Sequence, residues 1–106
     1  SNPNAFFVNI TSPASGGLYL APTNMTIAAR VKSPADPVAR VEFFEGGAKL
    51  GEDSTSPYSL AWNNVGVGSY TLRAVATQGG GLMATSPPVT ISVASGDNSR
   101  QVERSR

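Results

Sequence analysis

The sequence has 106 residues, the length of one domain, and its 14% charged residues, 11 glycines and 8 prolines favour strands and turns over helices. No run approaches the roughly 18 apolar residues of a membrane span, so we expect no membrane insertion. The net charge is only +1, and neither histidine nor cysteine occurs, which excludes a nucleic-acid footprint, a disulfide and a thiolate or imidazole metal site.

Alternation of apolar and polar residues with a period of two predicts strands along most of the chain. The first strand covers residues 6–11, and a short extended piece follows at 18–20. A strand with one polar face covers residues 25–32. Pro34 and Pro37 end it, because proline cannot donate to a strand ladder.

The central segment predicts a hairpin with a buried inner face. Val41 and Phe43 point to one side of a strand, and Phe44 points to the other. Gly46-Gly47 reverses the chain, because glycine accepts positive φ without steric cost. Residues 49–51 form the short returning strand.

Three further strands are expected over residues 58–62, 70–77 and 82–93. The glycines at 79–81 form the hairpin between the last two. Pro87-Pro88 interrupts the final strand, which fits a sheet edge or a bulge and not a central strand.

These elements predict an all-β fold, an immunoglobulin-like antiparallel β-sandwich of seven to eight strands. A closed barrel fits less well. Residues 1–93 form the domain, and residues 94–106, which are small or charged, are expected to be a disordered tail or an interdomain linker.

The residues offer little chemistry, so we expect no enzyme, no catalytic residue, no metal and no cofactor. Glu52-Asp53 is too sparse for calcium, which needs several converging oxygen ligands, and is expected to be a solvated turn. An amide cross-link from Lys32 or Lys49 is not expected, because residues 89–93 contain no asparagine.

Four residues are expected to have structural roles. Phe43, Trp62 and Leu72 fall on inward-facing positions of their strands. Tyr70 begins its strand two residues before Leu72, which is where immunoglobulin-like folds place a tyrosine corner. Its hydroxyl would bond to the backbone a few residues upstream.

A ligand patch is the remaining candidate site. Phe44 lies on an otherwise polar face, and Phe7 or Tyr19 could add further exposed rings. Exposed aromatic rings on one face are what stacking against sugar rings requires. Phe44, Phe7 and Tyr19 are therefore the candidate contacts for a polysaccharide.

Several short segments in a fixed order resemble the bacterial Ig-like domains found in tandem in secreted glycosidases and cell-surface proteins. The segments are residues 10–16, 41–44, 50–51, 56–59, 62–65, 68–72 and 74–77. The resemblance covers residues 6–93 and implies no shared catalytic residue. A fibronectin type III domain fits less well, because its tryptophan belongs in the second strand, whereas Trp62 comes three or four strands later.

The resemblance implies a non-catalytic accessory module, a spacer or scaffold in a larger secreted or cell-surface bacterial protein. Its partners would be the neighbouring domains of the same polypeptide, and the isolated domain would be a monomer. Two alternatives remain: a module that binds a polysaccharide or a surface partner of a glycoside hydrolase or adhesin, and a self-assembly domain that adds strands edge to edge.

Overall fold

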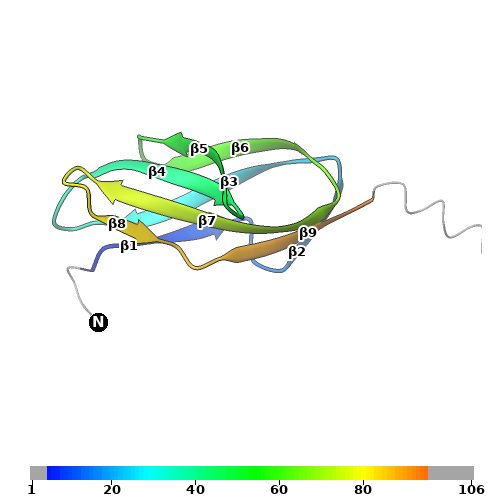
Figure 1. Ribbon diagram of the computed structural model, residues 1–106, viewed down its shortest axis with the longest axis horizontal. Coiled ribbons are helices and arrows are strands. Elements are labelled where there is room, and N and C mark those ends of the chain that lie inside the picture. The colour runs from blue at the N-terminus through cyan, green and yellow to red at the C-terminus, as the bar shows by residue number, and fades with distance from the viewer. Residues whose placement is uncertain (1–4, 96–106) are drawn as a thin grey trace, which may run out of the picture.

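The computed structural model describes residues 5–95, and all the regular structure in this range is β-strand. Nine strands follow each other along the chain: β1 Phe7–Ser12, β2 Gly17–Ala21, β3 Thr23–Lys32, β4 Val38–Glu45, β5 Ala48–Asp53, β6 Tyr58–Val65, β7 Gly68–Gln78, β8 Met83–Thr85 and β9 Val89–Ser95. They form two sheets packed face to face (Figure 1). The predicted all-β sandwich is confirmed.

The smaller sheet has three strands in the order β1-β3-β6, and the larger has six. In the larger sheet the order is β2-β9-β7-β4-β5, and β8 pairs with β7. Every pair is antiparallel except β2 with β9, which is parallel. The antiparallel prediction therefore needs one correction, at β2.

The predicted number of strands was one too low, because the last expected strand is divided in two. β8 pairs with β7 at residues 75–77, and β9 pairs with β7 at residues 68–72. Pro87 and Pro88 lie between them, and their missing N–H groups interrupt the ladder. The interruption expected at these prolines is therefore present.

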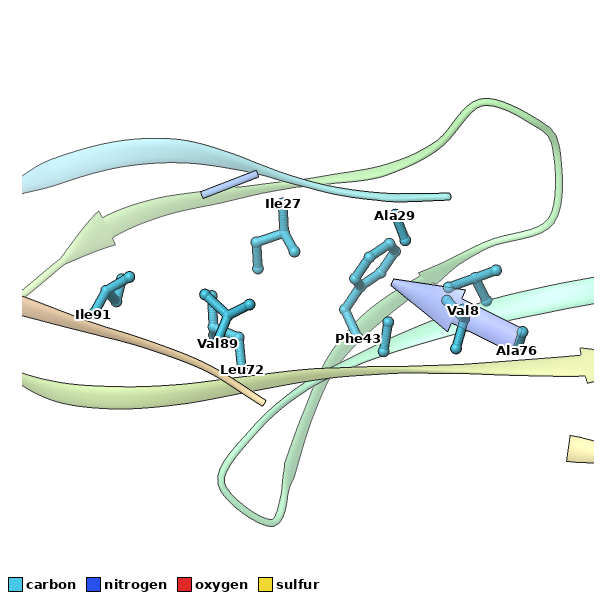
Figure 2. Close-up of a cluster of buried hydrophobic side chains, with 10 residues drawn as sticks. Val8, Ile27, Ala29, Phe43, Leu72, Ala76, Val89 and Ile91 are labelled. Atoms are coloured by element: carbon cyan, nitrogen blue, oxygen red, sulfur yellow. The ribbon is translucent and has the colours of Figure 1, made fainter. Parts of the chain in front are cut away.

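The core lies between the two sheets and consists of side chains from their inner faces (Figure 2). β3 contributes Ile27, which points toward Phe43, Leu72 and Ile91 of the larger sheet. The buried members of this cluster are Val8, Ile27, Ala29, Val41, Phe43, Leu72, Ala74, Ala76, Val89 and Ile91. Packing of these apolar groups holds the sheets together without a cross-link, since the chain has no cysteine.

The adjacent rings of Phe43 and Phe44 show how the alternation works. Phe43 is fully buried, whereas Phe44 on the opposite face of β4 is half-buried. The hairpin that follows turns at Gly46-Gly47 as predicted, and Gly46 has a φ of 57°. A residue with a side chain would be strained at that angle.

The chain enters and leaves the sandwich at opposite ends (Figure 1). Phe7 at the start of β1 pairs with Lys32 at the end of β3. Ser95 at the end of β9 pairs with Ala21, which lies two residues before the start of β3. The two ends are called below the N-terminal end and the C-terminal end of the sandwich.

The C-terminal strand continues two residues beyond the expected domain limit at residue 93, since β9 includes Ala94 and Ser95. The rest of the expected tail, residues 96–106, lies outside the described residues.

Alanine substitutions of the two neighbouring phenylalanines should show which face of β4 is buried, because their losses of stability should differ. Phe43→Ala empties the centre of the core and should cost roughly 3–5 kcal/mol of unfolding free energy. Phe44→Ala removes a half-buried ring from the outer face and should cost about 1 kcal/mol or less. Urea unfolding followed by tryptophan fluorescence measures both values, and equal losses would contradict the assigned faces.

Candidate functional site

The three aromatic residues of the expected ligand patch lie on three different parts of the molecule. Phe44 is on the outer face of the larger sheet, between Lys49 of β5 and Arg73 of β7. Phe7 belongs to β1 of the smaller sheet and is 38% exposed. Tyr19 lies on β2 and packs against the core. The structure therefore does not bring these rings together as one platform.

Tyr19 is the candidate ring that packs against the core. Its ring is half-buried, and it is the flanking Leu18 and Leu20 that are exposed, by 71% and 63%. Side chains alternate along a strand, so Tyr19 can face the core only if both leucines face outward.

The outer face around Phe44 is occupied by a chain of ion pairs. Lys49 Nζ lies 2.9 Å from Glu42 Oε2 and 2.6 Å from Glu52 Oε1, and Arg40 Nε lies 3.7 Å from Glu42 Oε1. Hydrogen bonds to Glu42 and Glu52 raise the pKa of Lys49, and the bond from Lys49 lowers the pKa of Glu52. A more basic lysine and a more acidic carboxyl are poorly suited to nucleophilic or general-acid chemistry at neutral pH.

Asp53 accepts hydrogen bonds that hold the connection from β5 to β6 in place. One carboxylate oxygen accepts from the backbone N–H of Ser59 at 3.0 Å, and the other accepts from the N–H and hydroxyl of Thr55 at 3.1 and 3.2 Å. These bonds, led by the one from Ser59, lower the pKa of Asp53. The sequence indicated only a solvated turn here. The Asp-x-Thr spacing, typical of an Asx turn, was the available signal.

No group of three or more His, Cys, Asp or Glu side chains within residues 5–95 could hold a metal ion. The same range contains no helix with the length and apolar character that crossing a bilayer requires.

Tyr70 makes the bond that defines a tyrosine corner. Its hydroxyl donates to the carbonyl oxygen of Gly66 at 2.7 Å, across the connection from β6 in one sheet to β7 in the other. Its ring also meets Trp62 edge to face, with centroids 5.1 Å apart and an interplanar angle of 84°. Trp62 packs against the core, and Leu72 is fully buried. This cluster fixes the crossover between the sheets.

Tyr70→Phe removes the bond to Gly66 and keeps the ring, so it should lower the unfolding free energy by about 1 kcal/mol. Tyr58→Phe is the matched control, because the Tyr58 ring packs against the core and its hydroxyl makes no hydrogen bond with the described residues. Thermal unfolding of both variants measures the difference. Equal destabilisation would contradict a specific role for the corner.

Asp53→Asn should lower the melting temperature at pH 7, because the backbone donors lose a charged acceptor. The folded pKa is depressed, so the stabilisation is complete above the unfolded pKa of about 3.9 and is lost as the pH falls through the folded value. The difference in melting temperature between the wild type and Asp53→Asn should therefore disappear in strong acid. Asp36→Asn is the control, and a gap that persists at low pH would contradict this account.

Comparison with known proteins shows what the chain is similar to. The fibronectin(III)-like modules of Clostridium thermocellum CbhA are 36% identical, with a TM-score of 0.80 over 83% of this chain and 96% of that chain. The endo-β-1,4-mannanase of Thermotoga petrophila is 9% identical, with a TM-score of 0.70 over 90% of this chain and 21% of that chain. The titin M3 domain is 12% identical, with a TM-score of 0.52 over 85% of this chain and 99% of that chain.

The last two similarities show the fold alone, and the search of curated proteins gave no match. A family model for the bacterial Ig domain matches residues 7–74. The CbhA relative is called fibronectin(III)-like, whereas the matching family model is that of the bacterial Ig domain. The chain belongs to the bacterial Ig domain family.

Proposed function

We propose that this domain is a non-catalytic spacer that holds neighbouring domains of a larger extracellular bacterial polypeptide apart. The observation that carries the proposal is that the start of β1 and the end of β9 lie at opposite ends of the sandwich (Figure 1). A module with this geometry adds its full length to the distance between the domains on either side.

The strand register gives the size of that distance. β1 begins beside Lys32, and β9 ends beside Ala21, so the start of β1 and the end of β9 are separated by about the length of β3. β3 runs from Thr23 to Lys32, and at about 3.3 Å per residue it spans roughly 30 Å. A flexible linker would lose conformational entropy if it had to hold two domains at a fixed separation. The folded module keeps that separation without a further entropy loss, because its chain is already ordered.

A spacer also has to resist bending at its ends, and connections at the N-terminal end are bonded to one another. Gln78 Nε2 donates to Ser33 Oγ at 3.1 Å, and the N–H of Gly79 donates to the carbonyl oxygen of Pro37 at 3.0 Å. These bonds join the β3–β4 connection to the β7–β8 hairpin. At the C-terminal end, the Tyr70 corner braces the β6–β7 connection.

The chemistry of the surface supports a passive role. Arg40 and Glu42 of β4 and Lys49 and Glu52 of β5 form ion pairs with one another. The candidate rings Phe44 and Phe7 lie on opposite sheets. Bacterial Ig and fibronectin III-like modules are generally accessory domains and are typical of extracellular proteins. A polysaccharide platform would need several rings on one face.

Replacement in the full-length polypeptide tests the proposal. An unrelated Ig-like domain with its ends also at opposite poles should preserve the activity that depends on domain separation, because only length and stiffness are required. A Gly/Ser linker of equal residue number should not, because it behaves as a flexible coil. Activity that survives the linker but not the Ig-like replacement would contradict a spacer.

Binding to a panel of soluble and insoluble polysaccharides tests the competing function. The spacer proposal expects no retention of the domain by any of them. Retention by one glycan that Phe44→Ala abolishes, with folding unchanged, would make the domain a carbohydrate-binding module and locate its face.

A further inference from the structure

We propose that β2 is an association edge, where two copies of this chain pair antiparallel and extend the larger sheet across both molecules. β2 is the outermost strand on its side of the larger sheet, and β9 is its one partner among the described strands. An edge strand presents unpaired backbone N–H and C=O groups, which another strand can bond.

The other edges carry charges, bulges or a very short strand, whereas β2 is uncharged and regular over its five residues and ends directly before Pro22. β5 carries Lys49 and Glu52, and β8 has three residues and leads into Pro87. The ladder between β1 and β3 shifts register at Ile10. β6 ends near Asn64, whose φ is 57° and where its pairing with β3 shifts register. Charges, short length, prolines and bulges are the usual means by which proteins protect sheet edges.

β2 itself is regular, apolar and uncharged. All five of its residues pair in register with β9. No charged residue occurs between positions 5 and 29, and Leu18 and Leu20 are 71% and 63% exposed on the outer face of the sheet. An exposed, apolar edge strand that carries no charge is a site of strand pairing.

A second copy is the partner that the spacing of the two exposed leucines fits. A two-fold axis at Tyr19 places Leu18 of each molecule opposite Leu20 of the other. Residues directly opposite each other lie on the same face of an antiparallel pair, so the four leucines form one apolar cluster. No charge is buried in this arrangement, and each leucine covers an exposed leucine of the partner.

The small size of the edge sets the strength of the association. Stable interfaces bury about 1,200–2,000 Å² in total, and a strand of five residues supplies less. We therefore expect a dissociation constant on the order of 0.1 mM. Such pairing populates dimers where copies of the protein are concentrated, and leaves monomers in dilute solution.

Sedimentation velocity of the whole chain from roughly 10 µM to 1 mM tests the proposal, a range that brackets the expected dissociation constant. The average mass should rise from 10.9 kDa toward twice that value. Leu18→Lys combined with Leu20→Lys should weaken dimerisation roughly tenfold or more, because lysine opposes lysine. Leu82→Lys is the control, because Leu82 is 61% exposed and lies outside β2.

A charge-paired variant tests the register. Leu18→Lys with Leu20→Glu places lysine opposite glutamate in the antiparallel pair, so dimerisation should return and weaken with added salt. In a parallel pair the same variant would place like charges opposite each other. A wild-type protein that stays monomeric at every concentration would overturn the proposal. It would then point to a strand of a different protein as the partner of β2. Dimers that the double lysine variant leaves intact would overturn it as well.

Discussion

The contact between the inner faces of the two sheets is the interaction on which the rest of the domain depends. Phe43 and Leu72 of the larger sheet meet Ile27 of the smaller one, and all three are fully buried. The chain has no cysteine, so this packing alone holds the layers together. Because close-packed side chains lock each strand's orientation, the core also decides which residues each outer face presents.

Two consequences of that packing determine what the domain can do. The crossover between sheets, braced by Tyr70, directs β7 back along the molecule and leads to a last strand that ends far from the first. The fixed orientation of Tyr19 toward the core turns Leu18 and Leu20 outward at a sheet edge. The first consequence supports a spacer, and the second a surface where two such spacers meet.

The fold was predictable from the sequence wherever polar and apolar residues alternate clearly, as at Phe43 and Phe44. Around Tyr19 the orientation of the side chains was not predictable, because three large apolar residues in a row give no contrast between faces. Its parallel partner β9 is also far away in sequence, and no local pattern specifies such a pairing. Asp53 was read as a solvated turn residue, because hydrogen bonds across a connection depend on the positions of both flanking strands.

The distance between residues 5 and 95, on either side of the sandwich strands, tests the central claim most directly. The chain has no native cysteine, so spin labels on Ala5→Cys and Ser95→Cys report this one distance. Pulsed electron paramagnetic resonance should give a single narrow distribution at roughly 30 Å or more, the length of β3. A short distance of about 10 Å, or a broad distribution over the whole range, would contradict a rigid module that separates its neighbours.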